Sequence, residues 1–211
     1  MKRCSLVILV ALFVALSCAK YHVKNEISHG SEINKLKKTG IIIRKTHNTP
    51  IPLKLFNKNL SQWLVPYHKV KELVLIETTS KNLNRSNMES DRFLQFSNVG
   101  DFQLYQCQGI VAHYLAKNKE ELDKIRSDNN LDSIVIYEVD AGYSRELQYI
   151  DFSSMVILVD NNDKILYMDR QHDKHETFEI DEKVMREELL DLISNRLLNK
   201  IVDLKYIMKK R

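Results

Sequence analysis

The sequence predicts an α+β (mixed α/β) domain: a single sheet with a C-terminal hairpin, packed by two or three helices that include a long C-terminal helix. Three observations predict this class. The β-branched, apolar runs at residues 40–44 and 133–141 are typical of buried strands. The tetrapeptide Asp-Asn-Asn-Asp at residues 160–163 separates two further apolar runs, as a hairpin turn does. From Val184 to Leu204, apolar residues recur along one helical stripe. Helices packed on one sheet define the class.

In the first half of the chain, the run Ile41-Ile42-Ile43 predicts a strand over residues 40–44, which the prolines at 50 and 52 end. From Leu53 onwards, apolar residues recur every three or four positions, which predicts an amphipathic helix ending at or before Pro66. A second strand is expected over residues 72–79.

The middle of the chain is less regular. Residues 80–91 are crowded with Asn and Ser and are expected to form a loop. Residues 102–113 are expected to contain an extended segment, and residues 120–127 to lie in a helix that Asp128-Asn129-Asn130 ends.

The last third gives the most regular pattern. Strands are expected over residues 133–141, 152–159 and 164–169, with the turn between the last two. Asp181 is a suitable N-cap for the long C-terminal helix, because its short side chain can accept hydrogen bonds from unpaired backbone N–H groups. Glutamates near the start of this helix and lysines near its end complement the helix dipole.

Composition bounds the function. A length of 211 residues fits one domain, and 44% hydrophobic with 28% charged residues excludes a disordered chain. The formal net charge of +4 does not indicate a nucleic-acid partner. We find no Gly-x-Ser-x-Gly, Gly-x-Gly-x-x-Gly or Walker A pattern, so no cofactor and no catalytic residue are expected.

The N-terminus has the residue order of a signal peptide. Lys2 and Arg3 precede an apolar run over residues 6–16, and small residues follow it. This run is shorter than the roughly 20 residues that a membrane-spanning helix needs. The alternative is a buried N-terminal core helix, which the polar residues from Lys20 onwards disfavour.

The tetrapeptide Ala15-Leu16-Ser17-Cys18 resembles the lipobox of bacterial lipoproteins. That family prefers Leu three residues before the cysteine and a small residue two before it, so the reversed Ala15 and Leu16 are more similar to the relaxed lipobox of spirochaetal lipoproteins. The resemblance implies that a diacylglycerol is added to the Cys18 thiol and that the chain is cut before Cys18. The new amine is then often acylated with a fatty acid such as palmitate, and the protein is anchored in the envelope. Ala19 is compatible with the outer membrane. The alternative is cleavage near Ala19, which would release a soluble secreted protein.

These expectations divide the chain into a signal peptide at 1–17, a lipid-anchored polar tether at 18–38 and one globular domain at 39–211. Lysines of the tether could also attract anionic lipid headgroups. After loss of Cys4 and acylation of Cys18, Cys107 has no disulfide partner in its own chain. We expect it to be a small buried side chain rather than a reactive nucleophile.

A second resemblance covers about the last 100 residues. From Leu131 onwards, the order of strand, hairpin and terminal helix is similar to that in the periplasmic domains of curli-secretion lipoproteins and of lipoprotein activators of cell-wall synthases. It rests on the order of elements rather than on a motif.

The segment His172-x-x-His175-Glu176 contains three residues of the types that bind metal ions in proteins. Residues three apart on a strand lie on opposite faces, and a helical zinc motif would place the histidines four apart, so no metal site is predicted. The expected function is therefore a non-enzymatic adaptor or binding module with a protein partner in the envelope. The alternatives are a secreted metal-assisted hydrolase using His172, His175 and Glu176, or a carrier of a small apolar ligand.

Overall fold

The computed structural model describes residues 26–28, 30–33, 35–46, 49–64, 72–78, 80–86, 93, 102–144, 149–176 and 181–209. The expected signal peptide, Cys18 and the first part of the tether lie outside these residues. Among the helices described, none combines the length and the apolar character that a bilayer crossing requires.

Seven of the described segments form one mixed sheet in the order β1-β7-β6-β5-β2-β3, with β4 paired to β2. β2 runs parallel to β3, β4 and β5, whereas β5, β6 and β7 form an antiparallel meander and β1 pairs antiparallel with β7. The strands are β1 (Glu26–Ser28), β2 (Lys38–Thr46), β3 (Glu72–Leu75), β4 (Arg85–Ser86), β5 (Ser133–Ser144), β6 (Tyr149–Asp160) and β7 (Ile165–Glu176).

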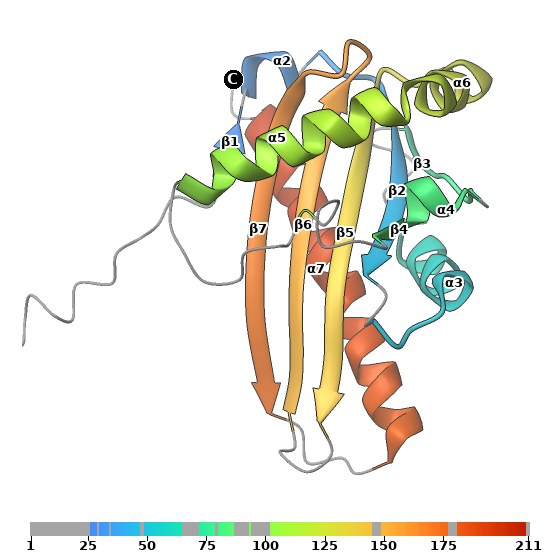
Figure 1. Ribbon diagram of the computed structural model, residues 1–211, viewed down its shortest axis with the longest axis vertical. Coiled ribbons are helices and arrows are strands. Elements are labelled where there is room, and N and C mark those ends of the chain that lie inside the picture. Colours follow the sequence, from blue (N-terminus) through green and yellow to red (C-terminus); the bar gives the residue numbers. More distant parts are fainter. Residues whose placement is uncertain are drawn as a thin grey trace, which may run out of the picture.

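Helices lie on both faces of this sheet (Figure 1). They are α2 (Gly30–Ile33), α3 (Leu53–Leu64), α4 (Lys81–Asn84), α5 (Phe102–Lys117), α6 (Lys119–Asn129) and α7 (Glu182–Lys209). Helix α7 runs behind the long strands, and α5 crosses in front of their upper half (Figure 1). We call these the α7-side face and the α5-side face.

The α7-side face carries a large apolar core that extends along β5 and β6. Its buried side chains include Val135, Tyr137, Ile150 and Phe152, which pack with Ile193 and the other buried residues of α7. The Tyr137 hydroxyl donates a hydrogen bond of 3.0 Å to the carbonyl oxygen of Ile193, so even the polar atom of this tyrosine is satisfied inside the core.

The α5-side face has a second core beneath the helix. Cys107, Val111, Tyr114 and Leu115 of α5 are buried there. They pack with strand residues that include Ile42, Ile134, Ile136, Met155, Ile157 and Met168. The spacing of the four α5 residues places them on one side of the helix.

The predicted fold class is confirmed: the protein is a mixed α+β domain with one sheet, a hairpin and a long C-terminal helix. The expected strand at 40–44, the helix beginning at Leu53 and the helix over 120–127 are present with small shifts of their ends. Asp181 caps α7 as expected, because its Oδ1 accepts from the backbone N–H groups of Lys183 and Val184. The turn at 160–163 joins β6 and β7, and Asp163 adopts a positive φ of 61° there.

Two expectations are wrong. Residues 102–113 are helical in α5 rather than extended, because buried side chains at 107, 111, 114 and 115 follow the helical repeat. The expected loop at 80–91 contains α4 and β4, since the Ser80 hydroxyl oxygen accepts from the Leu83 N–H and caps a short helix.

Part of the expected tether belongs to the folded domain. β1 pairs with β7 from Glu26 to Ser28, and the Ile33 side chain is buried in the α7-side core. The Asp132 carboxylate accepts hydrogen bonds from the backbone N–H groups of Lys37 and Lys38. These contacts place the described residues from 26 onwards in the domain rather than in a tether.

Candidate functional site

The lower half of the α5-side face is polar. There the long strands continue past α5 (Figure 1). On this part of β5, β6 and β7, the alternate residues that face the α5 side are polar and partly exposed. We call this set the polar strip and define it as Asp140, Asp151, Ser153, Arg170 and His172. The pairing of Ser153 with both Asp140 and His172 places the set across the three strands.

The polar strip brings a serine, a histidine and an aspartate together. The Ser153 Oγ lies 2.9 Å from Nδ1 of His172, and Oδ1 of Asp151 lies 3.5 Å from the same nitrogen. In a hydrolytic triad the serine contacts one ring nitrogen and the carboxylate the other, so that the ring can pass a proton between them. Here both partners meet one nitrogen, and the cluster has the geometry of a surface hydrogen-bond group.

The three residues considered as metal ligands, His172, His175 and Glu176, all lie on β7. His172 faces Ser153, whereas Glu176 is exposed and the side chain of His175 lies outside the described side chains. Positions 172 and 175 are three apart on a continuous strand and therefore on opposite faces. Within the described residues, no group of three or more His, Cys, Asp or Glu side chains is placed to hold a metal.

A buried ion pair lies at the boundary between the apolar and polar halves of the α5-side face. Nε of Arg44 is 3.1 Å from Oε2 of Glu138, and both side chains are 0% exposed. The Arg44 guanidinium carbon also lies 4.4 Å from the ring centre of Phe93 and 4.6 Å from that of Tyr114. The two rings and the carboxylate offset part of the hydration free energy that this cation loses on burial.

Sequence reasoning did not single out this pair. The available signal was a charged residue that directly follows the apolar run of each of two strands, at Arg44 and Glu138. A charged side chain that a strand pattern places in the core needs a partner of opposite sign. The parallel pairing of β2 with β5 sets Arg44 directly beside Glu138.

Cys107 contacts Phe93, the residue whose ring lies beside Arg44, and has the environment of a structural thiol. It is buried, as expected, and its Sγ donates to the Phe93 carbonyl oxygen at 3.1 Å. Burial raises the pKa of the Cys107 thiol, and the charge of Glu138 adds to this while that of Arg170 opposes it. A protonated, buried thiol is a poor nucleophile.

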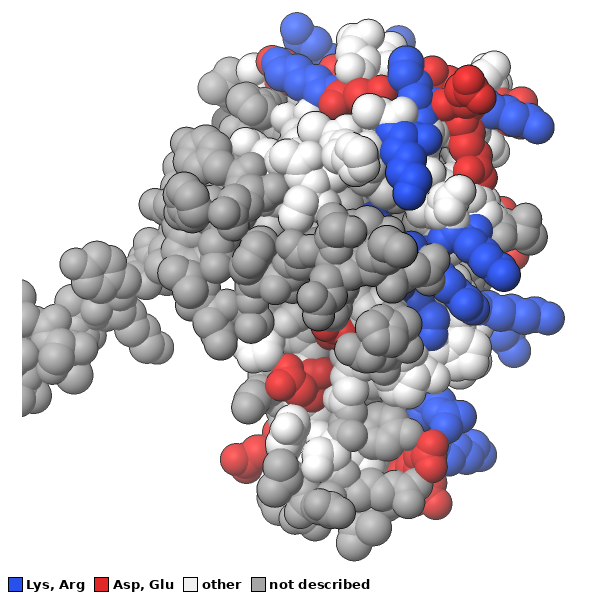
Figure 2. Space-filling model, in the orientation of Figure 1, with Lys and Arg blue, Asp and Glu red and all other residues white. Residues whose placement is uncertain are grey.

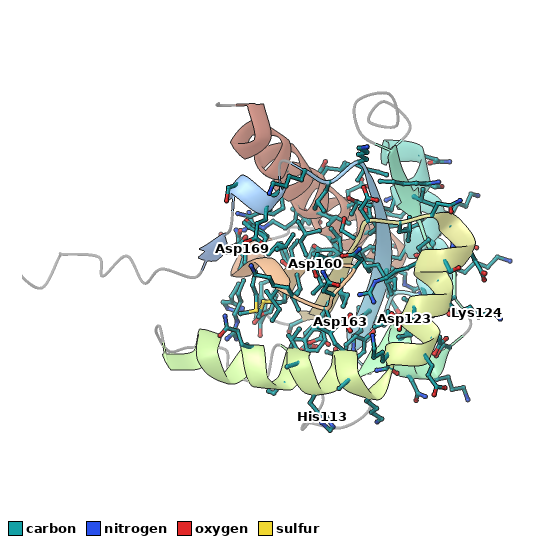
Figure 3. The ribbon with its side chains drawn as sticks, turned by 90° about the horizontal axis from the view of Figure 1, so that it is seen from above. His113, Asp123, Lys124, Asp160, Asp163 and Asp169 are labelled. Carbon is teal, nitrogen blue, oxygen red and sulfur yellow. The ribbon has the colours of Figure 1, made fainter. Side chains whose placement is uncertain are left out.

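The acidic turn between β6 and β7 is neutralised within the fold. Asp163 binds Arg126 at 2.6 Å and Lys119 at 3.5 Å, and Asp123 binds the same two cations. Figure 3 shows Asp163 and Asp123 close together, between the turn and α6. The hydrogen bond from Lys119 lowers the pKa of Asp123. These carboxylates are therefore occupied by side chains of the protein, which leaves no calcium-type site in this group.

Basic side chains gather at the sheet edge formed by β3 and β4. We call this the basic edge and define it as Lys54 and Lys58 of α3, Lys81 of α4 and Arg85 of β4, all exposed. Figure 2 shows lysine and arginine along this side of the molecule. No ion pair involves these four side chains within the part of the chain that the structure describes.

A fifth cation strengthens the positive potential of the basic edge. Lys45 lies beside Arg85 in the pairing of β2 with β4, and its ammonium donates to the carbonyl oxygens of Thr49 and Ile51. Burial lowers the pKa of Lys45, and the charge of Arg85 lowers it further. Carbonyl oxygens satisfy its N–H groups without cancelling its charge.

The sequence matches no protein-family model and no curated protein. Among solved structures, the PelC dodecamer from Paraburkholderia phytofirmans aligns with 8% identity and a TM-score of 0.43, covering 81% of this chain and 90% of that chain. Lipoprotein GNA1162 from Neisseria meningitidis aligns with 12% identity and a TM-score of 0.33, covering 76% of this chain and 96% of that chain. At these identities and TM-scores the likenesses carry no argument about function.

Proposed function

We propose that this protein is an exported lipoprotein of the bacterial envelope, held at a membrane by acyl chains on Cys18. The order of Lys2 and Arg3, the apolar run at 6–16 and Ser17-Cys18 carries this proposal. Each buried CH₂ contributes about 0.8 kcal/mol, so two or three acyl chains anchor a protein durably whereas a single chain does not. Delivery to the outer membrane, for which Ala19 is permissive, is part of the proposal.

The folded domain acts in this proposal as a non-enzymatic binding module for another envelope protein. The observation that supports it is the geometry at His172, where Ser153 and Asp151 compete for one ring nitrogen. A proton relay would need them on different nitrogens, so this cluster does not favour hydrolysis. The placement of positions 172 and 175 on opposite faces of β7 likewise favours binding over metal-assisted hydrolysis.

Metabolic labelling with a palmitate analogue tests the anchor. In a bacterial host, the unmodified chain is expected to incorporate the label and to fractionate with membranes, and Cys18→Ala to do neither. Cys107→Ala is the matched control and should label normally, because Cys107 is buried in the domain. Labelling that persists in Cys18→Ala, or an N-terminus that still starts at Met1, would overturn the proposal.

A binding measurement with zinc tests the hydrolase alternative. We expect no zinc-dependent stabilisation of the domain, and the same result for His172→Ala. Zinc binding in the unmodified chain that is lost in both His172→Ala and Glu176→Gln would instead support a metal site on β7.

A further inference from the structure

The basic edge brings four exposed cations together on one side of the domain. Several lysines and arginines elsewhere on the domain are bound by carboxylates: Lys164 by Glu32, Lys200 by Asp169 and Arg126 by Asp163. Lys54, Lys58, Lys81 and Arg85 have no such partner among the described residues. Helix α3 contains no acidic residue at all, so nothing on its own surface offsets Lys54 and Lys58.

An exposed leucine lies within this charged surface. Leu55 is 40% exposed and stands next to Lys54 and one helical turn from Lys58. Helix α3 packs against α7, β2 and β3, so it lies at the same end of the sheet as β4, which carries Arg85. A surface of lysines around an accessible apolar side chain suits a partner that has both carboxylates and an apolar residue, which is a protein rather than a simple polyanion.

We propose that the basic edge, with Leu55 as its apolar contact, is the surface on which this domain binds an acidic segment of a partner protein. The proposal rests on the proposed binding function and names the surface and the chemistry of the partner. Acidic side chains near the edge are Glu77 and Glu121, and the Glu121 carboxylate already accepts from the Ser80 hydroxyl. The edge therefore keeps an excess of positive charge.

The topology disfavours a membrane as the occupant of this surface. β1 and β3 lie at opposite ends of the strand order, so about five spacings of 4.8 Å, or roughly 24 Å, separate them before α3 and side chains are added. The eight residue steps from Cys18 to Glu26 span at most about 28 Å. With the acyl chains in a bilayer, the basic edge would touch lipid only at nearly full extension of this segment. It is better placed to meet a partner in the aqueous phase.

Two variants of equal charge change test the proposal. Lys58→Glu/Arg85→Glu alters the basic edge, and Lys35→Glu/Lys183→Glu alters exposed lysines that lie elsewhere on the domain. The full chain, purified in detergent, is titrated against fluorescent poly-L-glutamate and a glutamate–tyrosine copolymer of matched length, with circular dichroism to check folding. We expect the edge variant to bind the copolymer about tenfold more weakly and the control variant to bind within about twofold of the unmodified chain.

Leu55→Ser isolates the apolar contact. The unmodified chain is expected to prefer the copolymer to poly-L-glutamate, and Leu55→Ser to lose that preference while keeping its affinity for poly-L-glutamate. Equal weakening by the edge and control variants, or no binding by the unmodified chain, would overturn the proposal. Edge-dependent binding to phosphatidylglycerol vesicles that is tighter than binding to the copolymer would also overturn it, in favour of a lipid surface.

The binding experiment and the labelling experiment test the basic edge and the lipid anchor independently. Binding to the copolymer does not require acylation, and labelling of Cys18 does not require the basic edge. If labelling fails and edge-dependent binding holds, the anchor is wrong and this inference stands. If labelling holds and binding does not depend on the edge, this inference is wrong and the anchor stands.

Discussion

The two faces of the sheet are made by the same long strands and differ sharply in their lower halves. Phe152 points to the α7-side face and is 4% exposed, whereas its neighbour Asp151 points to the opposite face and has a side chain that is 36% exposed. Helix α7 crosses diagonally behind the strands (Figure 1), and the α7-side core includes Ile150 and Phe152 near the start of β6. The α5-side face is apolar only where α5 crosses it. The extent of the covering helix thus matches the extent of apolar sequence on each face.

The Arg44–Glu138 pair lies at the boundary between the covered and uncovered halves, and breaking it gives the largest expected effect. Glu138→Leu leaves a buried guanidinium beside two rings without its carboxylate, which is expected to cost about 3–5 kcal/mol in unfolding free energy. The double variant Arg44→Met/Glu138→Leu removes both charges and should recover most of that loss. Urea unfolding followed by circular dichroism measures both.

A double variant as unstable as Glu138→Leu alone would show that the packing of Arg44 against Phe93 and Tyr114, and not the ion pair, carries the stability of this boundary. That result would make the boundary an ordinary part of the apolar core.

Substitution of two glycines allows a direct comparison of the covered and uncovered halves of the α5-side face. A Cβ added at Gly40 would lie 2.6 Å from Cδ1 of Leu131, whereas one added at Gly142 would meet no atom within 4 Å. Gly40→Ala is therefore expected to cost about 1–3 kcal/mol through overpacking. Gly142→Ala should be neutral or stabilise by up to about 1 kcal/mol, because glycine is unfavourable inside a strand. Equal effects at the two positions in thermal unfolding would contradict the difference between the halves.

Much of the fold followed from local patterns because each such pattern has a single physical cause. Short segments of sequence were enough in three cases. The Ile41-Ile42-Ile43 run indicates a strand, the Asp-Asn-Asn-Asp segment indicates a turn, and the apolar stripe of α7 indicates a helix. Helix α5 was not predicted from the sequence, because Val111 and Tyr114 favour strands and Gly109 interrupts the helical pattern. Only its packing on the sheet makes its repeat of buried residues evident.

The candidate sites depended on pairing that no local pattern records. Arg44 and Glu138 are far apart in sequence and meet through the parallel register of β2 with β5. Ser153 meets His172 through the register of β6 with β7, which contains an irregularity between Leu158 and Val159. A shift of one residue would send His172 to the other face. The basic edge likewise combines three elements that the sequence separates.

On the α7-side face, a smaller effect is expected from the hydroxyl of Tyr137, which is buried in the core. Tyr137→Phe removes the hydroxyl that donates to the Ile193 carbonyl oxygen and should cost about 1 kcal/mol. The carbonyl lies inside α7, so the helix can satisfy it without the tyrosine. Urea unfolding measures the change, and a loss as large as that of Glu138→Leu would show that this face depends on a polar contact as much as the other does.

The mildest expected effect is a pH dependence from the α5-side core. Burial raises the pKa of Cys107, with Glu138 raising it and Arg170 lowering it, relative to a reference value of 9.0 in the unfolded chain. Well below pH 9.0 both states keep the proton, and the thiol does not affect stability. Above it the unfolded chain loses the proton first, so stability falls with pH by at most about 1.4 kcal/mol per unit.

Lys45 contributes the opposite slope, because its lowered pKa makes the folded chain release a proton before the unfolded chain does. The measurement is therefore the difference between the unmodified chain and Cys107→Ala, unfolded in urea from pH 8 to pH 10, which cancels Lys45. We expect the variant to lose less stability than the unmodified chain over this interval. Parallel curves would mean that the Cys107 thiolate is tolerated in the fold, and the α5-side core would then be more polar beneath its helix than the burial of its side chains indicates.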